Sequence, residues 1–301
     1  MYYIVFPLLY VISLIPFFIL YPISDGIAFL LYHVFKYRRD VVYKNLQIAF
    51  PEKTVKEHKA IAKRFYQNLT DTFLEIIKLI SISDKTLAKR CGGDFSMIDE
   101  LAKKGKNIQI HAGHQFNWEY GSLFMSGSIK TIATYAIYTP INSKPLERLF
   151  LKIRQRYGTR FIKSTEFKTK KDQIFKERFV FFLAADQVPG NAAGGYWQNY
   201  FGKPAPFITG PEISGIKNNT AIVFARSRIV KRGHYVCECS LFAENGASTE
   251  TGEITRAFRD FLEKVVREEP HNYLWTHRRW KLEYKPEFKN KWIDDKTNAP
   301  G

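Results

Sequence analysis

The sequence predicts one α/β domain with a mixed, mostly parallel sheet flanked by helices, preceded by an N-terminal membrane-anchoring helix. Two observations predict the domain. Short apolar, β-rich runs alternate with helix-like segments, as in sheets covered by helices on both faces. No internal repeat or low-complexity linker divides the chain. A third observation, the near absence of charge at the N-terminus, predicts the anchor. We therefore expect an anchor at residues 1–35 and one domain at residues 36–301.

The anchor comes first along the chain. No side chain of residues 2–24 is charged, and Asp25 is the only charged side chain before Lys36. About 20 apolar residues cross a bilayer as a helix, and the run lacks the basic start of a signal peptide. Prolines within it would bend the helix, so a full span and a partly buried hairpin both stay open, as does a buried helix of a soluble domain. The basic flank that follows, Lys36, Arg38 and Arg39, places the domain on the cytoplasmic side of the membrane.

The domain elements follow in order. The expected helices are 55–80, 145–157, 167–177 and 252–269. The expected strands are 107–111, 130–135, 159–162, 179–184, 221–229 and 235–242. The last two strands are predicted to form a hairpin through Lys231, Arg232 and Gly233.

Charge and cysteine content narrow the function classes. Lys and Arg total 46 against 29 acidic residues, a net charge of +17, which favours anionic partners. The basic residues are dispersed and form no nucleic-acid module, so no nucleic-acid partner is expected. Three cysteines make no disulfide framework, and no His or Cys spacing indicates a metal site.

The chemical signal is a histidine followed by a glutamate. His114 and Glu119 lie between an apolar strand and a helix-like stretch. In one continuous helix they would lie about 140° apart, but they can meet if His114 is in the turn and Glu119 in the first helical turn, with Asn117 as N-cap. A carboxylate that orients an imidazole is the base half of a Ser-His-Asp arrangement. His114 is then a candidate general base for an acceptor hydroxyl that attacks an acyl thioester.

Five segments together resemble the lipid A biosynthesis lauroyl/myristoyl acyltransferase family, within the lysophospholipid acyltransferase superfamily. His114 and Glu119 match its H-x₄-D/E motif, although Phe116 stands where the family often has Gly and would narrow the approach to the pair. The other segments are 45–52 (NLQIAFPE), 153–158 (IRQRYG), 185–187 (ADQ) with 200–202 (YFG), and 270–281 (PHNYLWTHRRWK). The resemblance implies a glycerolipid-acyltransferase-like fold with residues 36–301 as the acyltransferase domain.

The resemblance also assigns residues beyond the pair. It implies an important arginine in the arginine-glycine segment, with Arg154 the better match and Arg156 close behind. A guanidinium there binds a substrate phosphate or the oxyanion of the attacked thioester. Asp186 follows an apolar strand, where α/β sheets place their ligands, and is expected to hold Arg154. These three and Asn117 are the expected substrate-binding residues. The aromatic-basic segment 275–280 is open to two interpretations: ligand binding, or fastening of the C-terminal segment.

The expected enzyme transfers a fatty acyl group, other than an amino-acyl group, to a hydroxyl of an anionic glycolipid, a lipid A precursor. The resemblance implies acyl carrier protein as the donor, an acidic partner suited to the basic surface, and acyl-CoA is the alternative. No metal or organic cofactor is expected, since the thioester is already activated. Two alternatives stay open. One is the same chemistry on another membrane lipid, an amino-acid-containing lipid or an inositol mannoside. The other is a non-catalytic basic protein that binds membranes.

Overall fold

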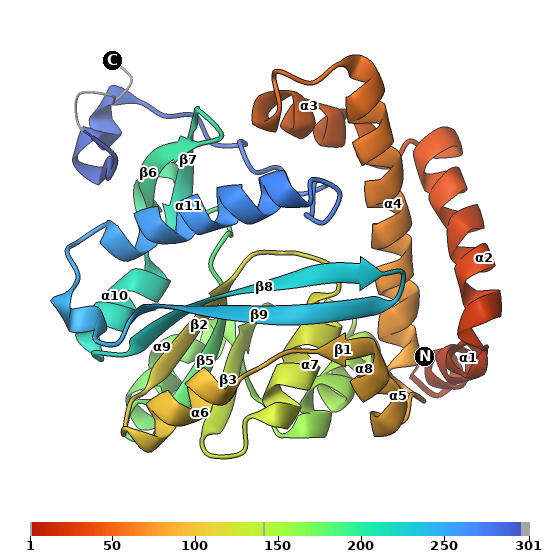
Figure 1. Cartoon of the computed structure of the whole chain (residues 1–301), viewed down its shortest axis with the longest axis horizontal. Coiled ribbons are helices and arrows are strands. Elements are labelled where there is room, and N and C mark those ends of the chain that lie inside the picture. Colours follow the sequence, from red (N-terminus) through yellow and green to blue (C-terminus); the bar gives the residue numbers. More distant parts are fainter. Residues whose placement is uncertain (1, 141, 296–301) are drawn as a thin grey trace.

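A seven-stranded sheet forms the centre of the computed structural model, which describes residues 2–140 and 142–295 (Figure 1). Its strand order is β1-β9-β8-β2-β5-β3-β4, and all neighbours are parallel except the β8–β9 hairpin. The strands of this sheet are β1 (Cys91–Gly92), β2 (Ile108–Ala112), β3 (Ala133–Tyr138), β4 (Arg160–Lys163), β5 (Phe179–Ala184), β8 (Ala221–Lys231) and β9 (His234–Ala243). A separate antiparallel pair consists of β6 (Gly195–Tyr200) and β7 (Lys203–Ile208).

Helices cover both faces of the sheet. The α-helices after residue 36 are α3 (Arg39–Ala49), α4 (Val55–Lys78), α5 (Asp84–Arg90), α6 (Ser96–Lys103), α7 (Trp118–Ser128), α8 (Lys144–Arg154), α9 (Ser164–Ile174), α10 (Gly210–Lys217) and α11 (Glu253–Glu268). Short 3₁₀ turns are η2 (Gln155–Tyr157), η3 (Ala192–Gly194), η4 (Gly246–Ser248) and η5 (Pro286–Lys291).

Strand β8 begins with five consecutive apolar residues, and its packing shows why. Ile222 and Phe224 pack in one hydrophobic cluster with α11, while Ala221 and Val223 pack in a second cluster on the opposite face. Alternate side chains of a strand point to opposite faces, so a strand covered on both sides needs apolar residues at every position. The expected α/β architecture is confirmed.

The predicted strands are also present in the structure. Each of the six predicted strands overlaps a strand of the sheet, and the hairpin turns at Gly233, whose φ is +72°. The β6–β7 pair was not predicted. Pro204 and Pro206 fall inside β7, and proline is depleted in strands because it lacks an N–H donor.

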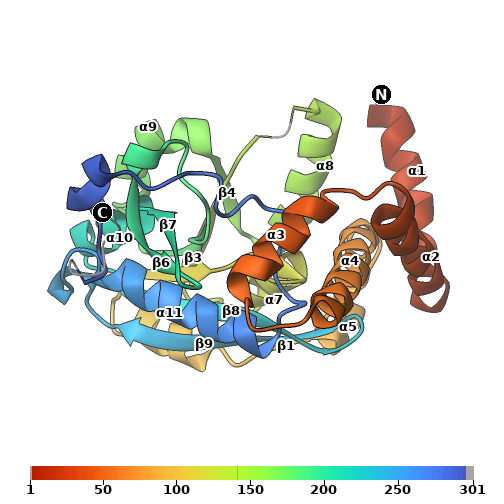
Figure 2. The ribbon, with the colours of Figure 1, turned by 90° about the horizontal axis from the view of Figure 1, so that it is seen from above.

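The expected apolar N-terminal helix is present, and the segment is divided into three helical pieces. These are α1 (Tyr2–Leu14), α2 (Phe17–Phe29) and the π-helical η1 (Leu30–Val34). Pro16 is the N-cap of α2, and its missing N–H explains why α1 does not continue. The stretch Phe17–Val34 has the length and apolar composition of a membrane span. In both views, however, α2 lies alongside α4 (Figures 1 and 2).

Residues 1 and 296–301, which belong to the predicted anchor and domain respectively, lie outside the described residues.

Candidate active site

The expected site lies where two neighbouring parallel strands end. Strands β2 and β5 pair in register, with Ala112 opposite Ala184, and each strand is followed two residues later by a polar side chain. These side chains are His114 and Asp186. Because the carboxyl ends of parallel strands meet at one edge, the two groups come together. His114 Nδ1 lies 2.7 Å from Asp186 Oδ1, and the His114 backbone N–H donates to Asp186 Oδ2 at 2.9 Å.

The turn that carries His114 is held on both sides. A Cβ on Gly113 would lie 2.5 Å from Leu262 Cδ1 of α11, so only glycine permits this close approach. Leu274 N–H donates to the His114 carbonyl at 3.1 Å, and Phe116 N–H donates to Asn272 Oδ1 at 2.8 Å. The C-terminal segment therefore fixes the conformation of the turn that carries His114.

Phe116 does not narrow the approach to His114, contrary to the sequence prediction. Its side chain is fully buried, with its ring centroid 5.8 Å from that of Phe65 on α4. The bulk that replaces glycine in the family motif is accommodated by the hydrophobic core and does not line the site.

Asn117 caps α7, as expected. Its Oδ1 accepts from the backbone N–H groups of Glu119 at 3.1 Å and Tyr120 at 3.2 Å, and its Nδ2 donates to Glu75 at 3.0 Å. Asn117 has no exposed surface. Its side chain thus positions the start of α7 and is not placed to contact a substrate, which corrects the expected binding role.

Glu119 pairs with Arg154, and the pairing differs from the one that we expected. Arg154 Nε donates to both carboxylate oxygens of Glu119, at 2.9 and 3.1 Å, and Arg154 Nη2 donates to Glu119 Oε1. Trp118 Nε1 donates to the same carboxylate at 3.1 Å, while the Trp118 ring stands edge-on to the His114 ring. The sequence prediction paired His114 with Glu119 and Arg154 with Asp186. The two carboxylates have exchanged partners.

The pKa shifts of His114 and Asp186 follow from this exchange of partners. The negative charge of Asp186 raises the pKa of His114 above its ordinary value, against the opposing effect of burial. Burial raises the pKa of Asp186, but the His114 charge and hydrogen bonds outweigh it, and the pKa falls below its usual range. The guanidinium of Arg279 lowers the pKa of Asp186 further. Asp186 therefore stays ionised, and His114 holds its Nδ1 proton toward it.

Arg156 is not brought to this cluster. Its Nη1 donates to the Ile82 carbonyl at 2.8 Å, and its Nη2 donates to Asp84 Oδ1 at 2.6 Å. It fastens the end of α8 to the segment between α4 and α5. His111 is buried in β2, where burial lowers its pKa to about 3, and its Nε2 lies 3.0 Å from the side-chain amide of Gln109. His111 is therefore not placed to act as a second base.

The aromatic-basic segment 275–280 fastens the C-terminal segment. Trp275 has no exposed surface, and Asn45 Nδ2 donates at 2.8 Å to the carbonyls of both Trp275 and His277. Arg279 is 1% exposed, with its guanidinium 4.0 Å from the Phe207 ring centroid. The sequence prediction missed the link from Arg279 to Asp186, because the two residues lie 93 positions apart (279 minus 186).

No three His, Cys, Asp or Glu side chains within residues 2–140 and 142–295 are grouped to hold a metal ion.

A model of the family described as bacterial lipid A biosynthesis acyltransferase matches residues 1–282. The chain belongs to this family. The resemblance seen in the sequence motifs is thereby confirmed, and with it the reaction class, acyl transfer for lipid A biosynthesis. A search of curated proteins finds no match. As a lipid A biosynthesis acyltransferase, the protein takes an acyl donor and a lipid acceptor, and the His114–Asp186 pair is the site at which their reaction is to be sought.

Proposed function

We propose that the protein transfers a fatty acyl chain from an acyl thioester to a hydroxyl of a lipid A precursor, with His114 as general base. The proposal rests on the hydrogen bond between His114 Nδ1 and the buried carboxylate of Asp186. Because Nδ1 keeps its proton, Nε2 is the nitrogen that accepts the proton of the acceptor hydroxyl. Asp186 takes the orienting role that the motif alone assigned to Glu119.

The reaction needs no covalent enzyme intermediate. As Nε2 removes its proton, the acceptor oxygen attacks the thioester carbonyl carbon and forms the new ester bond. The carbon–sulfur bond then breaks, and the His114 imidazolium returns the proton to the leaving thiolate. Arg154, held by Glu119, is the proposed cation for a substrate phosphate or for the negative oxygen of the attacked carbonyl. Its side chain is 23% exposed, so it remains accessible.

Acyl carrier protein is the proposed donor. A hollow of about 550 Å³ lies along α8, the helix that carries Arg154. Its lining has one carboxylate, Glu147, against five cationic side chains: Lys144, Arg148, Lys152, Arg156 and Lys163. A surface of this sign attracts an acidic protein. Acyl-CoA also carries negative charge and is the competing donor. The two donors, acyl carrier protein and acyl-CoA, are distinguished by measuring turnover with each. The variants are Lys144→Glu in the hollow and, as control, Lys217→Glu on the distant α10.

The decisive experiment is acyl transfer with purified protein, followed by mass spectrometry of the lipid product. Wild-type protein is expected to acylate a lipid A precursor from acyl carrier protein, and His114→Ala is expected not to. Transfer only to an amino-acid-containing lipid or an inositol mannoside would replace the proposed acceptor. No transfer to any lipid by folded wild-type protein would favour the non-catalytic membrane-binding alternative.

The proposed location is the cytoplasmic face of the inner membrane. The basic residues after the N-terminal helices, which the anionic cytoplasmic leaflet attracts, and the lipid nature of the acceptor support this location.

A further inference from the structure

The N-terminal helices expose apolar side chains along one face. On α1, α2 and η1 the exposed large apolar residues form a broad stripe. They are Leu8, Tyr10, Val11, Leu14, Phe18, Ile19, Ile23, Ile27, Phe29, Leu30 and Val34, and the exposed fraction reaches 76% at Phe18. An apolar stripe of this length is unfavourable in water and marks a contact surface.

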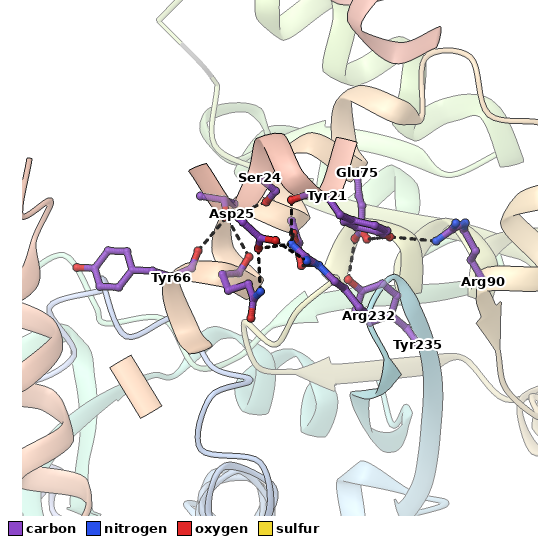
Figure 3. Close-up of polar contacts among 11 residues, drawn as sticks. Tyr21, Ser24, Asp25, Tyr66, Glu75, Arg90, Arg232 and Tyr235 are labelled. Atoms are coloured by element: carbon purple, nitrogen blue, oxygen red, sulfur yellow. Dashed lines mark hydrogen bonds and ion pairs between the residues drawn. The ribbon is translucent and has the colours of Figure 1, made fainter. Parts of the chain in front are cut away.

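On the opposite side, polar side chains bond these helices to the body of the protein (Figure 3). Tyr21 Oη donates to Glu75 at 2.9 Å, and Ser24 Oγ donates to Thr70 Oγ1 at 2.9 Å, both on α4. At the β8–β9 turn, Arg232 Nη2 donates at 2.7 Å to Asp25 of α2 and also to Asp71 of α4. The polar side chains of α2 thus point toward the protein, beside buried apolar ones such as Leu20 and Ala28, and the exposed side of the helices is apolar.

The junction between α1 and α2 is fastened in the same way. Lys78 Nζ, at the end of α4, donates to the carbonyls of Ser13 at 2.6 Å and Ile15 at 2.7 Å. Phe6 and Leu9 of α1 pack against the hydrophobic cluster that includes Leu149 of α8. Contacts with the domain therefore run from α1 through the whole of α2.

We propose that α1, α2 and η1 lie in the plane of the membrane surface, as a built-in part of the catalytic domain, and do not cross the bilayer. The partner of the exposed stripe is a phospholipid bilayer. If α2 crossed the bilayer, α4 would have to enter the bilayer as well, because the two helices are bonded to each other. Arg232, Asp71 and Lys78 would then lie at the depth of the hydrocarbon, which is strongly unfavourable. Lying in the interface, the helices keep every polar contact and bury the stripe among acyl chains.

The choice of a bilayer as partner rests on the proposed function, because the acceptor is a membrane lipid. The topology is tested separately. Two cysteines show on which side of the membrane the ends of the N-terminal segment lie. One is placed in a short polar tag before Met1, and the other is introduced by Lys36→Cys. In sealed inside-out vesicles, a membrane-impermeant maleimide is expected to modify both. Modification of the N-terminal cysteine only after detergent would show that the segment crosses the bilayer and would overturn the proposal.

A second measurement tests the stripe itself. Phe18→Glu with Ile23→Glu is expected to lower binding of the full-length protein to phospholipid vesicles by about tenfold or more. The matched control is Ile213→Glu on α10, also an exposed isoleucine (53%), which is expected to bind normally. Equal binding by both variants would remove the stripe as the contact surface. Acyl transfer to detergent-dispersed lipid is measured for each variant, so that loss of the chemistry is distinguished from loss of membrane contact.

Discussion

Replacing Asp186 by Asn tests whether Asp186 makes His114 an effective general base. The 2.7 Å hydrogen bond joins an ionised, 1% exposed carboxylate to the His114 ring. Two unit charges whose centres lie about 4 Å apart attract by about 4 kcal/mol at an effective dielectric constant of about 20. Asn keeps the shape but removes this attraction, and its amide nitrogen favours the wrong imidazole tautomer. We expect turnover to fall by about 10²- to 10⁴-fold.

The pH dependence of turnover shows the direction in which Asp186 shifts the pKa of His114. The charge of Asp186 raises the pKa of His114, so the protonated ring, which is inactive as a base, persists to higher pH. The wild-type rate is expected to rise with pH through a value above the ordinary histidine pKa of about 6.5. In Asp186→Asn only burial remains, and burial lowers the pKa of His114. The acid limb of the rate profile should therefore move to lower pH.

The matched comparison is Glu119→Gln. This change removes the partner of Arg154 but no hydrogen bond to His114. It should lower turnover while leaving the acid limb in place. The assay is kcat/KM against pH for the three proteins, with circular dichroism to verify folding. If Glu119→Gln moved the acid limb and Asp186→Asn did not, the pairing of His114 with Asp186 would be refuted as the basis of catalysis.

Four further predictions concern other residues. His114→Ala should lose about 10²- to 10⁴-fold in turnover in protein that circular dichroism shows to be folded, whereas His111→Ala should lower the melting temperature and largely spare turnover of the folded protein. Gly113→Ala should lower turnover by displacing the turn that carries His114, and adding Leu262→Ala should restore part of it in the same assay. Burial raises the pKa of Glu75 to about 7, so the native state binds the extra proton between about pH 4.5 and 7. Wild-type stability should then fall as pH rises through this range, and calorimetry of Glu75→Gln should show a flatter dependence. The apparent affinity for acyl carrier protein should fall as salt rises, because exposed charges are screened beyond about 10 Å at 0.1 M, and an affinity independent of salt would exclude electrostatic docking.

Local pattern was sufficient to predict much of this protein. The strands β5 and β8 contain runs of consecutive apolar residues, and β2 alternates apolar with polar residues, so their existence and approximate limits can be read from the sequence. The same is true of α4 and α11, whose apolar residues repeat with the helical period. The motif around His114 predicted the reaction class, which the family match confirms. Asn117 was predicted as a helix cap because capping depends only on neighbouring residues.

Tertiary structure decided which of these residues meet. His114 and Asp186 are 72 positions apart and touch only because β2 and β5 are neighbours in register, and strand order is not written in any local pattern. Glu119 turns to Arg154 because α7 and α8 lie together at that edge of the sheet. Hydropathy likewise predicted that the N-terminal segment is apolar, but it averages over both faces of a helix. Only the packed structure shows Tyr21 and Asp25 bonded inward to the protein and Phe18 facing outward.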